Sequence, residues 1–164
     1  VGLDKLHHHV KLTPGVPVKP MLAKPTTGVT EVLDRFSGIT FTCEYKYDGE
    51  RAQIHMLPDG TMKIFSRNLE DNTPKFPDVC RRMRELCGVG KPMAPSAESF
   101  ILDSEIVAWD KETGKILPFQ QLSTRARKGV AEEDITIQVR SFDSVCCGAM
   151  QCALHVSRVL THVR

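Results

Sequence analysis

The stretch EYKYDGERAQIH, residues 44–55, places a lysine between two acids and close to an arginine. A lysine is nucleophilic only as the neutral amine, and at pH 7 that form lies about 4.6 kcal/mol above the ammonium. Glu44 and Asp48 stabilise the ammonium, so on their own they oppose a nucleophilic Lys46. Arg51 or a bound divalent cation has the opposite effect on the amine. The pattern therefore indicates a nucleophilic lysine only in a site that also holds cations.

The same residues also allow a structural interpretation. A lysine flanked by acids on an exposed strand pairs with charges on a neighbouring strand and contributes less than ~1 kcal/mol. Asp48 either takes part in catalysis or organises a turn through Gly49. Gly49, without a side chain, would let a backbone approach a ligand closely. The short pattern alone leaves these alternatives open.

The elements that must position the lysine follow from the spacing of apolar residues. Residues 41–47 alternate apolar and polar, which predicts a strand with Glu44, Lys46 and Asp48 along its charged face. The alternation continues through 51–57, and a Pro-Asp-Gly turn leads to a returning strand at 61–66.

The rest of the chain predicts a sheet with a few helices. A proline-rich lead-in over 1–20 excludes a long regular element there, and 66–79 reads as a loop. Strands are expected at 100–110, returning through 116–119, and at 135–139; short helices are expected at 29–37, at 79–88 with Val79, Met83 and Leu86 inward, and at 120–128. The fold class is therefore α+β with an antiparallel-rich sheet.

Composition limits the class of protein. The 164 residues are one domain's worth, 41% apolar and 26% charged, with a net charge of only +2. No apolar run approaches the ~20 residues that span a bilayer, so no membrane association is expected. The six cysteines form no CxxC pair, which argues against a zinc site and for reduced thiols in the cytosol or nucleus. His7–His9 is interpreted as a solvated surface run. Because the first residue is valine, we expect a piece of a longer protein.

The longer string carries a resemblance. EYKYDGERAQIH resembles motif I of the ATP-dependent DNA ligases, within the superfamily of lysine nucleotidyltransferases that also holds RNA ligases and mRNA capping enzymes. VKPMLAKPT before it, and then IFSRNLEDNT, FILDSEIVAWD and PFQQLSTRARK after it, follow in the order typical of the eukaryotic DNA ligase I type. The resemblance covers about residues 10 to 139. It implies the nucleotidyltransferase (ATP-grasp-like) adenylation fold, of which this chain would hold the N-terminal part.

The resemblance implies a role for each matching residue. Lys46 would attack the α-phosphate of ATP and hold AMP, and Glu44 would contact adenine. Arg51 and Arg67 would lie near the ribose, the nucleotide phosphates and the 5′-phosphate of a nick, as guanidinium groups suit phosphate oxygens. Glu105 would serve the ribose or bind Mg²⁺. The implied cofactors are ATP and Mg²⁺.

The resemblance also implies partners and a location. AMP would pass to the 5′-phosphate of nicked double-stranded DNA, and the 3′-hydroxyl would displace it. Arg125, Arg127 and Lys128 would contact the DNA backbone, although a solvated helix face explains them equally well. A nuclear location follows, with roles in DNA replication, repair and recombination and contacts to replication or repair factors through the parent protein.

Departures from the family pattern set the expected domain boundaries. Residues 1–14 would end a preceding DNA-binding domain or linker, 15–140 would form a partial adenylation domain, and 141–164 would be a divergent segment of unknown structure. By the resemblance, Phe142 would take the place of the aromatic residue that stacks on adenine in the family. We expect this chain to lack the family's E-G-x-x-x-K motif, its second lysine motif and its OB-fold domain. Two alternatives therefore stay open: a non-catalytic nucleotide- or DNA-binding remnant, and an mRNA guanylyltransferase or RNA ligase.

Overall fold

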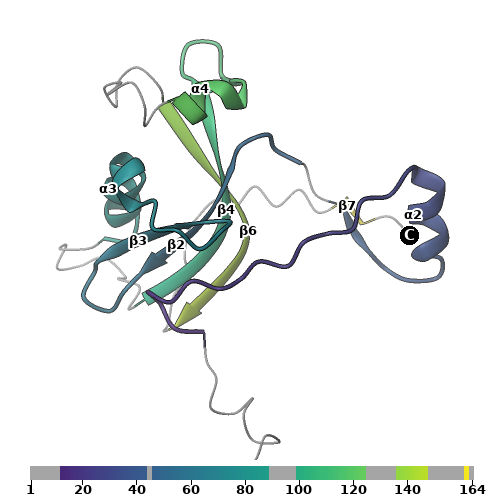
Figure 1. The fold of residues 1–164 in the computed structure, drawn as a ribbon, viewed down its shortest axis with the longest axis horizontal. Coiled ribbons are helices and arrows are strands. Elements are labelled where there is room, and N and C mark those ends of the chain that lie inside the picture. The colour runs from purple at the N-terminus through teal and green to yellow at the C-terminus, as the bar shows by residue number, and fades with distance from the viewer. Residues whose placement is uncertain (1–11, 44–45, 89–98, 125–135, 148–160, 163–164) are drawn as a thin grey trace, which may run out of the picture.

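The computed structural model describes residues 12–43, 46–88, 99–124, 136–147 and 161–162. Its centre is a five-stranded sheet in which every pairing is antiparallel (Figure 1). The strands are β2 (Glu50–Met56), β3 (Met62–Ser66), β4 (Ser99–Asp110), β5 (Lys115–Ile116) and β6 (Thr136–Cys147). The order is β3-β2-β4-β5, and β6 pairs with the other edge of β4. The predicted α+β class with an antiparallel-rich sheet is confirmed.

The hairpin of β2 and β3 forms where the alternation predicts it. Ile54 pairs with Ile64, and the connecting turn closes on Gly60, whose φ of +79° is the left-handed conformation that glycine adopts without strain. The Asp59 carboxylate accepts a hydrogen bond of 2.8 Å from the Thr61 N–H, which fixes the turn.

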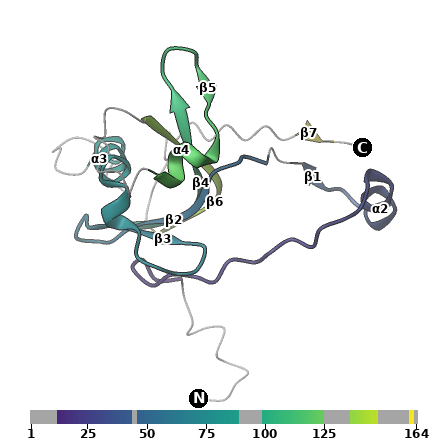
Figure 2. The same cartoon turned by 45° about the horizontal axis from the view of Figure 1, so that its top comes forward.

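One face of this sheet carries the apolar core. Alternate residues of β2, Ala52, Ile54 and Met56, are buried on that face. Helix α3 (Pro77–Leu86) covers it, preceded by the short 3-10 helix η2 (Thr73–Lys75) (Figures 1 and 2). Phe76, just before α3, and Phe100 of β4 are the largest fully buried side chains of this core.

Helix α3 corrects one sequence prediction. It begins at Pro77, two residues earlier than expected, and its predicted inward residues Val79 and Met83 are buried. Leu86 is 68% exposed, whereas Cys87 is buried. The inward stripe continues at a spacing of four residues beyond Met83, and Gly88 at φ +68° turns the chain away directly after it.

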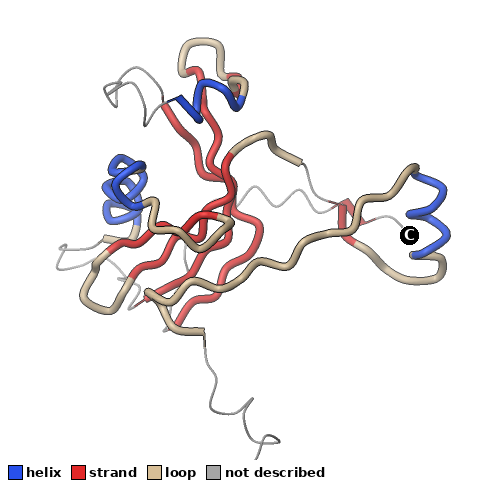
Figure 3. The backbone as a smooth tube through the Cα atoms, viewed as in Figure 1, coloured by secondary structure: helices blue, strands red, loops and turns tan. Residues whose placement is uncertain are grey.

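Strand β4 is the central strand. Its first half pairs with β2, its last two residues pair with β5, and its other edge pairs with β6 almost throughout (Figure 3). β6 extends to Cys147, well beyond the predicted strand at 135–139, and continues into the segment that gave no clear sequence pattern. A register shift opposite Asp103 and Ser104 leaves Phe142 as the extra residue of β6.

The remaining elements lie around this sheet. Helix α2 (Val29–Arg35) confirms the predicted helix but has no buried residue. It stands to one side together with β1 (Thr42–Cys43) and β7 (Thr161–His162), as Figure 1 shows. Helix α4 (Phe119–Thr124) forms the first part of the helix predicted at 120–128, and the rest lies outside the described residues. No helix in the described part of the chain is long and apolar enough to cross a bilayer.

Candidate functional site

A pocket of about 1020 Å³ opens where β2 begins, and it gathers several of the predicted site residues. Three chain segments line it, together with one residue each from β4 and the start of α4. The lining residues are Leu22 and Ala23; Lys46, Tyr47, Gly49, Glu50 and Arg51; Ser66, Arg67, Asn68, Glu70, Asn72 and Lys75; and Glu105 and Phe119. Four of these side chains are basic and three are acidic, and Lys46 and Arg67 are the basic ones for which no ion pair is found among the described residues.

The segment that carries Lys46 is a loop, which corrects the prediction of a continuous strand over 41–47. β1 ends at Cys43, and 46–48 form neither helix nor strand. Lys46 and Asp48 are exposed, and Asp48 does not line the pocket. The charged face that the alternation predicted is therefore replaced by a loop that brings Lys46 to the pocket.

Gly49 explains why the chain bends after this loop. A Cβ atom added to Gly49 would lie 2.3 Å from the Ile106 carbonyl oxygen and 2.9 Å from the Glu105 Cγ. Only glycine permits so close an approach, so the backbone at Gly49 packs directly against β4 while it also lines the pocket. This contact brings the Lys46 loop beside Glu105.

Arg51 is held by a residue that the sequence did not single out as part of the site. Its Nε donates to one oxygen of the Asp103 carboxylate at 3.0 Å, and its Nη2 donates to the other at 2.5 Å. This paired arrangement fixes the plane of the guanidinium group. The hydrogen bond raises the pKa of Arg51, so its positive charge is permanent. Asp103 thus orients a cation at the edge of the pocket.

Glu105 lies beside Arg51 and is half-buried. Burial raises the pKa of its carboxyl group, while a hydrogen bond from the Gly49 N–H and the charges of Arg51 and Lys46 act in the opposite direction. The described residues contain no cluster of three or more His, Cys, Asp or Glu that would enclose a metal ion. Mg²⁺ commonly takes only one or two carboxylates plus substrate phosphates, and Glu105 fits that mode.

Arg67 reaches the pocket from a tight turn. The Ser66 N–H donates to the Glu70 carbonyl at 2.9 Å, and the Ser66 Oγ accepts from the Asn68 and Glu70 N–H groups at 3.2 Å. Leu69 in this turn has a φ of +68°, the only positive φ of a non-glycine residue in the described chain. Strain of this kind is commonly found at functional sites. The turn leaves the Arg67 side chain exposed on the pocket wall.

A second ion pair in the pocket was also missed by sequence reasoning. Lys75 Nζ donates to one Glu50 carboxylate oxygen at 2.5 Å, and Asn72 Nδ2 donates to the other at 3.0 Å. Both members of the pair are about four-fifths buried, with side chains 20% and 18% exposed. The network ties the segment after Arg67 to the start of β2. No local sequence pattern predicts this ion pair, because 25 residues separate Glu50 and Lys75.

Some predicted site residues lie where the structure gives no account of their side chains. Glu44, Arg125, Arg127 and Lys128 fall outside the described residues. Phe142 is described only through the backbone of β6, where it occupies the register shift beside Asp103. The predicted roles of these residues stay predictions.

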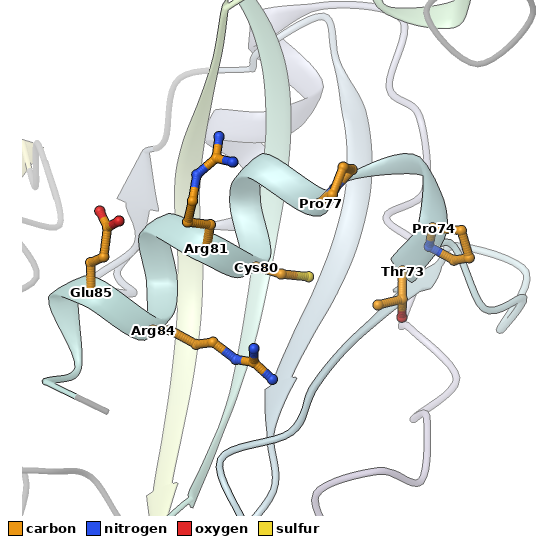
Figure 4. A pocket seen from close by; sticks show the side chains of 7 residues that line it. All are labelled: Thr73, Pro74, Pro77, Cys80, Arg81, Arg84 and Glu85. Atoms are coloured by element: carbon orange, nitrogen blue, oxygen red, sulfur yellow. The ribbon is translucent and has the colours of Figure 1, made fainter. Parts of the chain in front are cut away.

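A second pocket of about 540 Å³ lies along α3 and η2 (Figure 4). Its lining residues are Thr73, Pro74, Pro77, Cys80, Arg81, Arg84 and Glu85. Burial raises the pKa of the Cys80 thiol, so the sulfur stays protonated and unreactive. In Figure 4 the Arg81 and Arg84 side chains point in different directions rather than at one centre. The pocket at the start of β2 is therefore the better candidate for chemistry.

Comparison with protein families gives one matching model. Residues 20–157 match the model described as ATP dependent DNA ligase domain. The matched range contains the whole of β2, β3 and β4, with the Lys46 loop before them. It therefore includes every residue that lines the larger pocket.

Curated relatives agree with this match. The chain is 55% identical over 141 residues to DNA ligase 1 of Dictyostelium discoideum, covering 86% of this chain and 11% of that protein. It is 56% identical over 141 residues to DNA ligase 1 of Arabidopsis thaliana, covering 86% and 17%. A solved structure described as mycobacterial DNA ligase D complexed with ATP and MES aligns with a TM-score of 0.47 at 24% identity, covering 64% of this chain and 29% of that one. The chain thus spans between about a tenth and a fifth of these curated relatives.

Proposed function

This chain belongs to the ATP-dependent DNA ligase domain family, and from that premise we propose that Lys46 is its nucleophile, which takes AMP from ATP. One observation carries the proposal. Lys46 lines the same pocket as Arg51, Arg67 and Glu105, so an amine, two guanidinium groups and a carboxylate surround one space of about 1020 Å³. That volume is sufficient for a nucleotide.

The proposed first step is a phosphoryl transfer. Lys46 Nζ, having lost a proton to solvent, attacks the α-phosphorus of ATP. A phosphorus–nitrogen bond forms, the bond from the α-phosphorus to the bridging oxygen breaks, and pyrophosphate leaves with the electron pair. In such transfers positioning and charge neutralisation supply most of the catalysis.

The surrounding residues would support this step in distinct ways. Arg51, held in one plane by Asp103, presents a guanidinium group of fixed orientation that attracts phosphate oxygens. Arg67 adds a second guanidinium group from the turn that follows β3. Glu105 would hold Mg²⁺ together with the nucleotide phosphates, and the ion would neutralise their charge.

The later steps would use DNA. An oxygen of the 5′-phosphate at a nick attacks the phosphorus of AMP and frees Lys46, and the 3′-hydroxyl then displaces AMP to seal the strand. Nicked double-stranded DNA is therefore the proposed substrate. Because the relatives named DNA ligase 1 come from eukaryotes, a nuclear location and roles in replication, repair and recombination are proposed with it.

Covalent labelling tests the first step. The chain is incubated with α-labelled ATP and Mg²⁺, and the protein is separated under denaturing conditions. We expect labelled protein from ATP but not from α-labelled GTP, because the matching family is ATP-dependent. Lys46→Ala removes the nucleophile and should abolish the label, and Lys46→Arg should do the same while keeping the charge.

A matched control separates the proposal from its competitors. Lys111 is an exposed lysine in the turn between β4 and β5, and Lys111→Ala should label like the parent chain. Label from GTP alone would favour a guanylyltransferase. A folded chain that takes no label from either nucleotide would overturn catalysis by this chain and favour the non-catalytic remnant.

A further inference from the structure

The proline-rich segment of residues 13–23 is fixed to the polar face of the sheet, opposite the apolar core. We call this segment the strap. The Gly15 N–H donates to His55 Nδ1 at 3.0 Å, and the Val18 N–H donates to Gln53 Oε1 at 2.9 Å. Gln53 Nε2 in turn donates to the Val18 carbonyl. Both side chains are buried, with Gln53 5% and His55 0% exposed.

The strap follows β2 toward the nucleotide pocket. His55, Gln53 and Arg51 alternate along one face of β2, so they form a row that ends at the pocket. The strap meets this row in order, with Gly15 at His55 and Val18 at Gln53. Its next residues, Leu22 and Ala23, line the pocket, and Figure 1 shows the strap in purple along the sheet.

The position of Leu22 depends on these anchors. Pro17 and Pro20 restrict the backbone of the strap, so fixing Val18 also restricts where the chain can go four residues later. No helix or strand of its own holds the segment 12–28 before α2 begins. The two buried polar side chains therefore take the place of a strand pairing.

We propose that Gln53 and His55 are positioning residues that place Leu22 and Ala23 as an apolar wall for the nucleotide base. This inference rests on the proposed function, because it concerns the same pocket. The cationic residues Lys46, Arg51 and Arg67 suit phosphates, whereas the base is the part of a nucleotide that gains from apolar contact. Leu22 is 60% exposed and so has surface left to cover.

The test uses Gln53→Leu, which keeps a similar volume but removes both hydrogen bonds to Val18. Two measurements are made on the folded chain. Amide hydrogen exchange at Gly15 and Val18 measures how firmly the strap is held on the sheet, and exchange at Ile54 and Ile64 serves as an internal reference. Binding titrations with ATP and with inorganic tripolyphosphate, which has no base, report the pocket. Gln121→Leu, at an exposed glutamine of α4, is the matched control.

We expect exchange at Val18 to become at least roughly tenfold faster in Gln53→Leu while Ile54 stays protected. The dissociation constant for ATP should rise roughly tenfold, and that for tripolyphosphate should stay the same. Leu22→Gly, which removes the wall but keeps the anchors, should weaken ATP binding similarly without changing exchange at Val18. Gln121→Leu should change neither measurement.

Other results would overturn the inference in distinguishable ways. If Val18 exchanges at the same rate in Gln53→Leu, the anchor is not needed to hold the strap. If the strap loosens but ATP binds as before, the strap is not part of the base site, although the proposed function stands. Equal weakening of ATP and tripolyphosphate would indicate general damage to the pocket. A parent chain that binds neither ligand would overturn the proposed function and this inference with it.

Discussion

The two faces of the central sheet are both buried, but by different means. On the α3 face, Ile54, Ile64 and Phe100 interlock as apolar side chains that are 0% exposed. On the opposite face, Gln53 and His55 are as thoroughly buried, under a strap that reaches them through specific hydrogen bonds. Burial on the first face requires only shape and apolar area. Burial on the second also removes polar groups from water, which is costly unless they are paired. The strap pairs Gln53 and His55 Nδ1, whereas His55 Nε2 has no hydrogen-bond partner in the described structure.

This difference indicates what each face is suited to. An apolar face holds its shape over a wide range of pH, and it offers a ligand little to recognise. The polar face continues from the buried Gln53 and His55 to the half-exposed Arg51, Asp103 and Glu105. The same alternation of β2 therefore produces stability on one side and a charged pocket on the other. Four predictions test this division.

The largest effect is expected on the apolar face. Phe76→Ala removes a side chain that is 0% exposed and leaves a cavity, so we expect the free energy of unfolding to fall by about 3–5 kcal/mol. Urea unfolding followed by circular dichroism measures it. Leu33→Ala on α2, at a residue 52% exposed, should change stability by less than about 0.5 kcal/mol. Similar losses in the two variants would contradict the assignment of this face as the core.

The polar face should be the pH-sensitive one. Burial lowers the pKa of His55 to about 4, against 6.5 in an unfolded chain. The unfolded state therefore binds more protons between these values, and stability falls as the pH drops from about 6.5 to 4, by roughly 3 kcal/mol. Nδ1 accepts from Gly15, so protonation there would also place two donors face to face.

Unfolding at a series of pH values measures this effect. His55→Leu removes the titrating group, so the free energy of unfolding of this variant should depend much less on pH in this window. We expect the variant to be less stable than the parent chain at pH 7. A variant that kept the parent slope would show that another group is responsible. The Phe76→Ala variant should keep the slope, because it alters only the apolar face.

A smaller loss is expected at the edge of the pocket. Asp103→Ala removes two hydrogen bonds to the Arg51 guanidinium group, each to a charged partner, and should lower stability by about 2 kcal/mol. The fraction of protein labelled from ATP should fall by more than the fraction of folded protein does, because Arg51 loses its fixed orientation. Asp103→Asn keeps one acceptor oxygen, so its stability and its labelling should lie between those of the parent chain and those of Asp103→Ala. Unchanged labelling in Asp103→Ala would show that this orientation is not needed.

The smallest effect should be a gain. Leu69 has a φ of +68° in the turn that carries Arg67, and the left-handed conformation costs a residue with a Cβ about 1–2 kcal/mol. Leu69→Gly removes this strain but makes the unfolded chain more flexible, so the net gain should be about 0.5 kcal/mol. Leu69→Ala keeps the Cβ and should bring no gain. Thermal unfolding compares them, and a loss in Leu69→Gly would show that the leucine side chain stabilises the turn.

The apolar face could be predicted from the sequence because its signal is local. The alternation of Ala52, Ile54 and Met56 gives β2 and its inward face directly, and Pro58-Asp59-Gly60 gives the turn. The same rule failed at Lys46. Alternation continues through that segment, but the contact of Gly49 with β4 bends the chain into a loop. A contact between residues more than 50 positions apart leaves no trace in a short window.

The polar face was less predictable for the same reason. Arg51 and Glu105 were identified through a family resemblance. Their neighbours Asp103, Glu50 and Lys75 were not, because each pairing joins residues 25 or 52 positions apart in the chain. Gln53 and His55 occupy positions that usually face solvent in a sheet whose other face packs on the core. Their burial depends on a strap about 35 to 40 residues earlier, and that strap has no periodic pattern.

The separation of Arg51 from Asp103 has a consequence for how the site arises during synthesis. The two residues are 52 positions apart, so a growing chain makes the arginine long before its carboxylate. At about 5–20 residues per second, the delay is about 3–10 s. During this interval β2 and β3 can already pair, while the edge of β2 that will receive β4 has no partner. The ribosome therefore makes the lining residues up to Lys75 first, and the pocket is complete only when Glu105 and Phe119 have left the exit tunnel.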